Sequence, residues 1–540
     1  MSTDTRVLGI EGTAWAASAA VYDSGTEAVF IETDAYQPES GGIHPREAAE
    51  HMHEAIPKVV ETALAHARET ADRDDSEPPV DAVAFSRGPG LGPCLRIVGT
   101  AARALSGSLE VPLVGVNHMV AHLEIGRHFS GFASPVCLNA SGANAHLLAY
   151  RNGRYRMLGE TMDTGVGNAI DKFTRHVGWS HPGGPKVEAA AEDGEYVDLP
   201  YVVKGMDFSF SGIMSAAKAA YDEGVPVEDV CYSLQENIFA MLTEVAERAL
   251  SLTGSDEFVL GGGVGQNDRL REMLAAMCDQ RGARFYAPEA RFLRDNAGMI
   301  AVLGATMYEA GDTLEIDASR VDPNFRPDEV PVSWREGEDV VVGHDGSTRI
   351  RGAEAVVDLE PERGRVSKRR LSKSYRHPDL DDRLRRERTT LEARLTSLAR
   401  REGVPTPVVF DVDLAESTLE FEFVGETELR ERLTREHVRA VGRHLATIHG
   451  AGFVHGDPTT RNVRVDDERA YLVDFGLGYH TDHVEDYAMD VHVFDGSLVG
   501  TADDPEPLCE AAREGYREVG DERVLERLAD VETRGRYVDE

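Results

Sequence analysis

The sequence predicts an α/β domain followed by a smaller α+β domain. In the first part of the chain, strand-like runs alternate with helical stretches as far as about residue 320, and this alternation is typical of α/β folds. A chain of 540 residues also exceeds what one hydrophobic core usually supports. The strand-like runs cover residues 7–10, 18–22, 82–86, 113–116, 136–139 and 258–260.

A Pro-rich, acidic stretch at residues 322–345 separates the two parts and predicts a linker. Beyond it, strand-like runs return and helices follow, so a second domain is expected. The strands are expected at 354–359 and 418–423, and the helices at 380–401 and 436–450. We therefore predict a first domain at 1–325, a linker at 326–342 and a second domain at 343–540.

The composition is strongly acidic, with 95 acidic against 57 basic residues and a formal net charge of −38. Only seven of the basic residues are lysines. Because the acidic residues are spread along the chain and 41% of residues are hydrophobic, the composition indicates a folded protein rather than a disordered tail. Concentrated salt screens the self-repulsion of such a surface, so we expect the cytoplasm of an extreme halophile.

Cysteine usage and hydropathy exclude two other classes. The five cysteines are far apart and form no CxxC pair, which argues against a disulfide framework or a cysteine zinc site. The start of the chain is polar, and no apolar run approaches the roughly 20 residues of a membrane span. We therefore expect a cytoplasmic protein with no membrane partner.

Three small-residue turns in the first domain could approach a phosphate. Residues 9–13 lie in a strand, turn, strand context, 139–144 join two strand-like runs, and 261–267 lead from a strand into a helix. Small residues let backbone amides come close to an anion, and a glycine-rich turn at a helix N-terminus favours a nucleotide. None of the three is a GxGxxG fingerprint, and each is equally compatible with an ordinary turn.

A candidate metal site is predicted from His118 and His122, which are four residues apart. On a helix both imidazoles project from one face and can share an ion, although two surface histidines would have the same spacing. The zinc-protease motif HExxH is excluded because Met119 follows the first histidine. Asp295 could supply a carboxylate ligand or could instead cap the next helix.

The second domain contains the spacing of a phosphoryl-transfer core. Asp457, Asn462 and Asp474 lie at the offsets of the kinase catalytic Asp, the metal-binding Asn and the Asp of a DFG triplet. Lys368 and Glu392 could form the Lys–Glu pair that kinases require, although a surface lysine is the alternative. The ordinary Gly-rich loop is missing, and no APE triplet follows Asp474, so ATP hydrolysis or narrow phosphorylation is expected rather than broad protein kinase activity.

Several motifs in order make residues 6–325 resemble the universal tRNA threonylcarbamoyladenosine transferase family. They lie at residues 86–96, 117–122, 171–173, 183–188, 261–267 and 295–297. The resemblance implies an actin/Hsp70-like (ASKHA) fold of two α/β lobes with nucleotide and metal in the cleft. It also implies a metal, usually iron, with zinc possible, held by His118, His122 and Asp295. Relatives commonly have a tyrosine ligand where this chain has Asn139.

The same resemblance implies residues that hold the threonylcarbamoyl-adenylate. They come from the second small-residue turn, from the motifs at residues 171–173 and 183–188, and from the third turn. They are Asn139, Ala140, Ser141, Gly142, Ala143, Asp171, Gly184, Glu188 and Asn267.

From about residue 343 onward the chain resembles the small atypical kinase of the archaeal and eukaryotic KEOPS complex. The resemblance rests on residues 352–355, 366–378, 388–394 and the catalytic loop. It implies ATP with Mg, Asp457 as the catalytic residue, and an ATP site made by Gly352, Lys368, Glu392, Asn462 and Asp474. Archaea often fuse this kinase behind the transferase, and the chain matches that order.

Together the two resemblances imply transfer of a threonylcarbamoyl group from threonylcarbamoyl-AMP, made by a separate synthase, to the adenine 3′ of the anticodon in tRNAs that read ANN codons. The second domain would support turnover by hydrolysing ATP, with other KEOPS subunits as partners. Two alternatives remain: an ASKHA-type small-molecule kinase fused to a signalling Ser/Thr kinase, and a noncatalytic chaperone-like scaffold. The small-molecule kinase would need a catalytic Asp in the first domain, and we find no persuasive candidate. The set of Asp457, Asn462 and Asp474 argues against a noncatalytic scaffold.

We expect the melting temperature to rise strongly as KCl increases from about 0.1 M, where the Debye length is about 10 Å, to about 1 M, where it is about 3 Å. The reason is screening of the −38 net charge. Scanning calorimetry across this range measures the effect. A melting temperature that stays flat would contradict the halophile interpretation.

Overall fold

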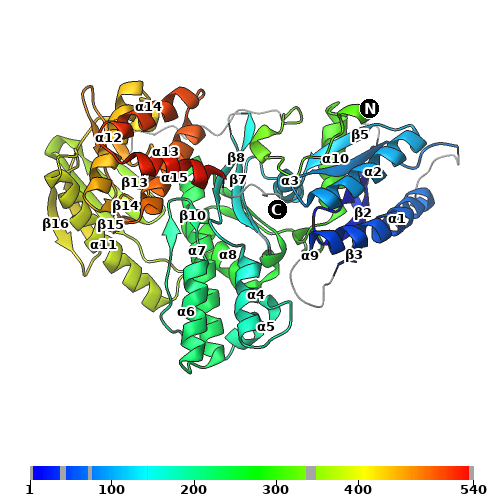
Figure 1. Cartoon of the computed structure of the whole chain (residues 1–540), viewed down its shortest axis with the longest axis horizontal. Coiled ribbons are helices and arrows are strands. Elements are labelled where there is room, and N and C mark those ends of the chain that lie inside the picture. The colour runs from blue at the N-terminus through cyan, green and yellow to red at the C-terminus, as the bar shows by residue number, and fades with distance from the viewer. Residues whose placement is uncertain are drawn as a thin grey trace.

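The computed structural model describes residues 4–36, 44–70, 76–142, 144–151, 153–335 and 348–533. We call residues 4–335 the first domain and 348–533 the second domain. Figure 1 shows three bodies along the long axis: an N-terminal lobe, a second lobe of the same domain, and the second domain. In the described part of the chain, no helix is both long and apolar enough to cross a membrane.

The N-terminal lobe contains a five-stranded mixed sheet in the order β3-β2-β1-β4-β5. β1 pairs antiparallel with β2 and parallel with β4. Alternate residues of β1 face opposite cores: Leu8 packs toward α1 and α2, whereas Val7 packs toward α3 and α10. The strands are β1 (Arg6–Glu11), β2 (Ala16–Asp23), β3 (Ala28–Ala35), β4 (Ala82–Gly88) and β5 (Leu113–Asn117).

The second lobe repeats this topology with the order β8-β7-β6-β11-β12. Here β6 pairs antiparallel with β7 and parallel with β11, so β6 holds the place that β1 holds in the N-terminal lobe. The repeated sheet is the two-lobed ASKHA arrangement expected from the sequence. The strands are β6 (Val136–Ala140), β7 (Ala145–Arg151), β8 (Arg154–Glu160), β11 (Glu257–Gly261) and β12 (Arg284–Tyr286).

Helices cover both sheets and meet between the lobes. Cys137 of β6 and Val259 of β11 share a core with Val116 and Ala297, so the inner faces of the two lobes pack around α3 and α10. The helices are α1 (Pro45–Thr70), α2 (Gly92–Leu109), α3 (His118–Ser130), α4 (Val166–His176), α5 (Gly184–Ala191), α6 (Ser211–Asp222), α7 (Val227–Thr253), α8 (Asp268–Arg281), α9 (Ala290–Leu293) and α10 (Ala297–Glu309). A short hairpin is formed by β9 (Val203–Lys204) and β10 (Asp207–Phe208).

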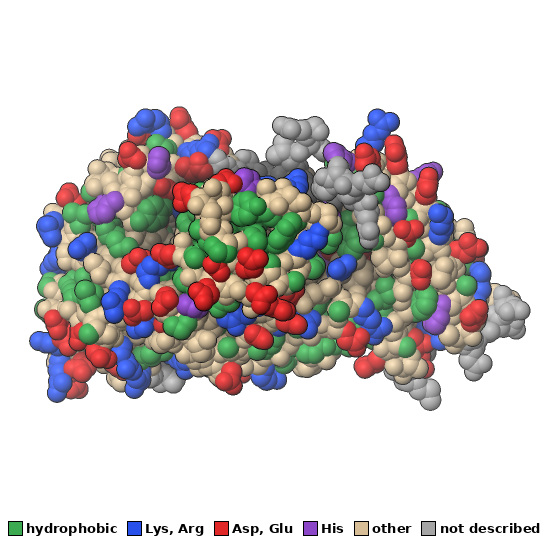
Figure 2. Space-filling model, turned by 90° about the horizontal axis from the view of Figure 1, so that it is seen from below, with side chains coloured by type: hydrophobic (Ala, Val, Ile, Leu, Met, Phe, Trp, Pro, Cys, Tyr) green, Lys and Arg blue, Asp and Glu red, His purple; other side chains and the backbone are tan. Residues whose placement is uncertain are grey.

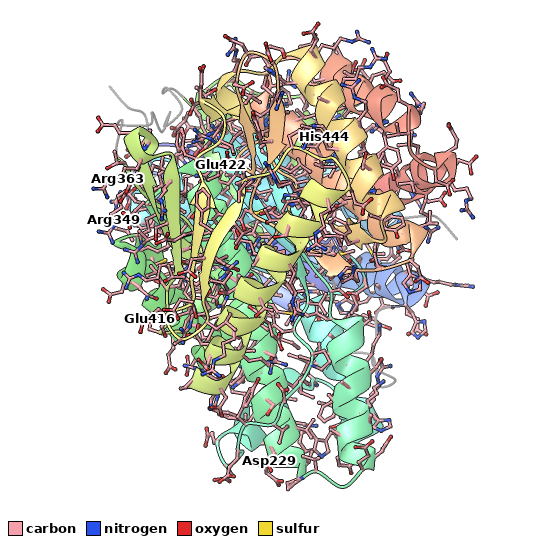
Figure 3. All side chains as sticks on the ribbon, turned by 90° about the vertical axis from the view of Figure 1, so that its left-hand side faces the viewer. Asp229, Arg349, Arg363, Glu416, Glu422 and His444 are labelled. Carbon is pink, nitrogen blue, oxygen red and sulfur yellow. The ribbon has the colours of Figure 1, made fainter. Side chains whose placement is uncertain are left out.

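The second domain consists of an antiparallel sheet followed by a mainly helical part. In Figure 3, Arg363 and Glu416 mark opposite ends of the sheet, and α11 lies beside it. The sheet has β13 (Arg349–Arg351), β14 (Ala355–Glu360), β15 (Arg365–Arg370), β17 (Thr418–Glu422) and β16 (Val409–Asp413) in that order. The other elements are α11 (Pro378–Arg401), β18 (Thr427–Glu428), α12 (Arg435–Gly450), β19 (Phe453–Val454), β20 (Val463–Val465), β21 (Ala470–Leu472), β22 (Tyr479–His480), α13 (Val484–Thr501), α14 (Glu506–Arg517) and α15 (Glu522–Thr533).

Residues 326–335, the described part of the predicted linker, pack on the first domain. Val330 joins the core between the lobes, and Arg335 forms an ion pair of 3.2 Å with Glu124 and stacks over Tyr150. The predicted boundary at residue 343 lies outside the described residues. The 326–342 linker therefore stays a prediction, with residues up to Arg335 held against the second lobe.

The second domain contacts the second lobe through buried charges on α7. Glu244, whose side chain is 1% exposed, lies 2.6 Å from Arg376 and 3.1 Å from Arg388 of the second domain. Glu247 forms a 2.6 Å ion pair with Lys373. Over the face shown in Figure 2, acidic and basic side chains are interspersed on the surface. At the interface between α7 and the second domain, by contrast, a compact set of opposite charges is buried away from water.

Replacing Glu244 with Gln is expected to cost about 3–5 kcal/mol, because the buried guanidinium groups of Arg376 and Arg388 lose the carboxylate that they share. Thermal unfolding in molar KCl measures this loss. Glu272→Gln is the matched control, because the Glu272 side chain is 68% exposed and pairs with Arg269 on the surface. Equal melting temperatures for the two variants would show that the buried network contributes no stability.

Candidate functional site

The first candidate site lies where β5 meets α3. Asn117 ends the strand, and its side-chain oxygen caps the helix by accepting hydrogen bonds from the backbone of Met119 and Val120 at 3.0 and 3.1 Å. His118 is therefore the first helical residue, and His122 lies one turn later on the same face. The helical spacing predicted for this pair is confirmed.

Asp295 completes a three-residue cluster. The Nε2 atoms of His118 and His122 each lie 3.3 Å from the same oxygen, Oδ1 of Asp295, while Trp15 Nε1 donates to Oδ2 at 3.0 Å. Asn296, not Asp295, caps α10 by accepting from Met299 at 3.2 Å. The alternative role considered for Asp295, a helix cap, is therefore wrong, and its carboxylate faces the histidines.

The cluster fits a metal ion on its geometry and donor set. The ligand atoms of His118, His122 and Asp295 all lie within 4.8 Å of one another. Two imidazoles and one carboxylate suit Fe(II) or Zn(II). Burial acts to lower the pKa of His118, but Glu11 and Asp295 raise it to about 10, so the surrounding carboxylates favour a positive charge at this position.

Glu11 was missed as part of this cluster, since the sequence showed it only within a possible phosphate turn. Its carboxylate is fully buried and lies 3.1 Å from Nδ1 of His118. Ser86 and Thr13 donate hydrogen bonds to it as well. A carboxylate on the second nitrogen of a metal-binding histidine fixes the orientation of the ring, and a buried glutamate at the end of an apolar strand was the available signal.

The predicted adenylate-binding residues converge on a cavity of about 2020 Å³ beside this cluster. Ala140 lies buried in β6 and does not line the cavity, and Ala143 lies outside the described residues. The cavity is lined by His118 and Asp295 and, among the predicted substrate residues, by Asn139, Ser141, Gly142, Asp171, Gly184, Glu188 and Asn267.

Hydrogen bonds hold several of these side chains in place. Asp171 accepts from the backbone of Gly183 at 2.7 Å, directly before α5 begins, and Asn267 caps α8 while its amide donates to Gln235. Glu188 accepts from the first backbone N–H of α8, that of Asp268, at 3.1 Å. The N-termini of α5 and α8 therefore border the cavity, where backbone N–H groups favour an anion.

Asn139 is oriented by a histidine that the sequence did not single out. Its amide Nδ2 lies 3.3 Å from Nε2 of His146, and its Oδ1 is buried with no hydrogen-bond partner. Burial lowers the pKa of His146 to about 3, so this imidazole is neutral and can accept the amide hydrogen. Asn139 thus lines the cavity with its amide fixed by His146, while its Oδ1 is buried beside the backbone of Gly261 and Gly262.

The second candidate site is a cavity of about 280 Å³ in the second domain. Lys368 lies 2.8 Å from Glu392 and 2.6 Å from Asp474. Asn462 donates to Asp457 at 2.9 Å. All five, together with Gly352, line the cavity, which is the arrangement that kinases use to hold phosphates and metal.

Arg248 of the first domain also lines this cavity, and the sequence gave no sign of it. Its guanidinium lies 3.5 Å from Asp457 and 2.9 Å from Glu354. Burial raises the pKa of Asp457, and Arg248 acts in the opposite direction. A residue of α7 therefore contributes to the electrostatics of a site whose other charged groups come from the second domain.

Comparison with known proteins decides the family. Residues 26–302 match the family described as tRNA N6-adenosine threonylcarbamoyltransferase. The chain belongs to this family. A probable bifunctional tRNA threonylcarbamoyladenosine biosynthesis protein of Haloquadratum walsbyi is 68% identical over 535 residues, covering 98% of this chain and 100% of its own. A protein of the same description from Natronomonas pharaonis is 70% identical over 533 residues, covering 99% and 100%.

The transferase family resemblance drawn from the motifs is thus confirmed. A third relative, with the same description, from Methanospirillum hungatei, is 50% identical over 98% of this chain and 99% of its own. This chain is an enzyme of tRNA threonylcarbamoyladenosine biosynthesis with two functional parts. The alternative of a small-molecule kinase fused to a signalling kinase is not favoured. We refer below to the transferase domain (residues 4–335) and the kinase-like domain (residues 348–533).

Replacing both His118 and His122 with Ala should remove bound metal from the threonylcarbamoyltransferase, because only one carboxylate of the cluster remains. Elemental analysis of the purified protein measures the metal directly. His181→Ala is a suitable control, since His181 lines the same cavity but lies outside the cluster. Full metal occupancy in the double variant would show that these histidines are not the ligands.

Proposed function

We propose that the transferase domain moves the threonylcarbamoyl group from threonylcarbamoyl-AMP to the exocyclic amine of the adenine 3′ of the anticodon in tRNAs that read ANN codons. The observation that carries this proposal is the convergence of the histidine–aspartate cluster and the predicted adenylate residues on one cavity. A bound metal, which we propose to be iron, would polarise the acyl carbonyl.

The surrounding residues have separable roles in this proposal. Gly184 and Asn267, at the N-termini of α5 and α8, would contact the adenylate. Asn139 would contact the threonylcarbamoyl group at the cavity wall, with its amide held by His146. Glu11 would hold the ring of His118, so that the orientation of the metal ligand does not depend on substrate.

We infer further that the kinase-like domain binds ATP with Mg and hydrolyses it to support turnover, with Asp457 as the catalytic residue. Lys368 would contact the phosphates, and Asn462 and Asp474 would hold Mg. RNA binding is dominated by phosphate neutralisation, and the chain carries a net charge of −38. Local arginines and further subunits of a KEOPS-type complex in the cytoplasm would therefore supply part of the tRNA contact.

Incubating the chain with a threonylcarbamoyl-AMP synthase, threonine, bicarbonate, ATP and a cognate tRNA tests the transfer reaction. The modified nucleoside is detected by mass spectrometry after digestion of the tRNA. We expect it to form with an ANN-reading tRNA and not with a variant in which the adenine 3′ of the anticodon is replaced. Equal modification of both tRNAs would contradict the proposed target.

In the full-length chain, Asp474→Ala should reduce ATP hydrolysis by at least about a hundredfold, because the site loses a charge that would hold the metal and neutralise Lys368. Asp482→Ala is the matched control, since the Asp482 side chain is 98% exposed nearby. Release of inorganic phosphate is measured for both. Undiminished hydrolysis in the Asp474 variant would place the ATPase in the transferase cleft instead.

A further inference from the structure

The β9–β10 hairpin of the transferase domain reaches the catalytic residue of the kinase-like domain. Its two turn residues, Gly205 and Met206, join strands that pair at Lys204 and Asp207. Met206 lines both the transferase cavity and the ATP cavity. In Figure 1 this hairpin lies between the second lobe and the kinase-like domain.

Gly205 faces Asp457 directly. A Cβ atom built on Gly205 would lie 3.6 Å from Oδ1 of Asp457 and 3.1 Å from both methyl groups of Val493. Arg248 fixes the turn from the other side, because its guanidinium donates to the carbonyl of Gly205 at 3.4 Å while lying 3.5 Å from Oδ2 of Asp457. The turn is therefore held with its α-carbon toward the catalytic carboxylate.

Lys204, directly before Gly205, also has defined contacts on the kinase-like domain. Lys204 forms a 2.7 Å ion pair with Asp486 and lies 5.4 Å from the ring centre of Tyr479. The side chain of Lys204 is 23% exposed. Lys204 and Gly205 thus contact separate parts of this surface. Met206 lines the ATP cavity beside them but packs against the core of the second lobe.

In kinases, the catalytic Asp accepts the proton of the acceptor hydroxyl, so the acceptor lies against this carboxylate. We propose that the β9–β10 turn occupies the acceptor subsite of the kinase-like domain, and that this subsite selects a lysine followed by a residue that carries the acceptor hydroxyl, presented in a β-turn. Gly205 holds the acceptor position without a hydroxyl. This inference rests on the proposed ATP hydrolysis by the same site.

The proposal predicts a new phosphorylation site when a hydroxyl is supplied. In Gly205→Ser, the serine Oγ would attack the γ-phosphorus of ATP, the bond from that phosphorus to the β,γ-bridging oxygen would break, and ADP would leave. The hydroxyl proton would pass to the carboxylate of Asp457. Gly205 has a φ of +58°, a conformation that serine adopts with some strain, so folding must be measured alongside.

The full-length Gly205→Ser variant is incubated with ATP and Mg, and phosphate at position 205 is measured by peptide mass spectrometry. We expect phosphorylation there in most molecules, and none in the Gly205→Ser, Asp474→Ala double variant. Gly205→Ala has the same strain and the same contacts with Val493 but no hydroxyl, so its melting temperature shows what the backbone change alone does. A folded Gly205→Ser protein that hydrolyses ATP yet carries no phosphate at position 205 overturns the proposal.

Two further measurements on these proteins distinguish failure of the proposed ATP hydrolysis from failure of the proposed lysine selectivity. If the unaltered chain hydrolyses no ATP, the proposed function of the kinase-like domain fails, whatever happens at position 205. If Gly205→Ser is phosphorylated, adding Lys204→Ala should slow the reaction at least tenfold, because the contact with Asp486 is lost. An unchanged rate would overturn the lysine selectivity.

Discussion

Two carboxylates on one face of α7, Glu244 and Glu247, fix how the kinase-like domain lies against the transferase domain. They are three residues apart, and Arg248 follows Glu244 by four, so all three project toward the same side of the helix. Each carboxylate is nearly excluded from water and meets cations of the other domain, Arg376, Arg388 and Lys373. Separating the domains would expose or unbalance these charges, so their relative position is strongly specified.

This interface brings the proposed ATP site to the transferase domain. Arg248 forms ion pairs with Glu244 of its own helix and with Glu354 and Asp457 of the kinase-like domain. Within the kinase-like domain, Glu392 pairs with both Arg370 and Lys368. Buried charges therefore extend from α7 to Lys368, the lysine that we propose contacts the phosphates. Met206 of the β9–β10 turn lines both cavities, so the two sites share a residue of the transferase domain.

Local patterns in the sequence were enough to predict much of the fold and of both sites. The strand runs were found because both faces of these sheets are buried, and His118 and His122 were found because their spacing matches one helical turn. Asp457, Asn462 and Asp474 were found because their offsets are fixed by the loop that carries them. Lys368 was favoured because lysine is scarce, and the structure places Lys204 and Lys373 in interdomain pairs as well.

What the sequence could not show depends on contacts between distant segments. Glu11 and Trp15 reach the histidine–aspartate cluster only after β1, β5 and α10, which are far apart in the sequence, pack together in the N-terminal lobe. Arg248 is an unremarkable helical arginine until the kinase-like domain packs against α7. Glu244 and Glu247 are similarly hidden, because an acidic chain offers many carboxylates and nothing in their spacing marks them as buried.

The most direct test of this interface is to place a protease site within residues 336–347, cut the chain, and follow association and tRNA modification as the pieces are diluted in molar KCl. We expect the cut pieces to co-elute and to modify tRNA at micromolar concentration. On dilution they should lose activity, because cutting removes the high effective concentration that the fusion provides. Pieces that carry Glu244→Gln should elute separately. Pieces that elute separately at micromolar concentration, or that keep full activity at nanomolar concentration, would contradict an interface that depends on both the buried charges and the fusion.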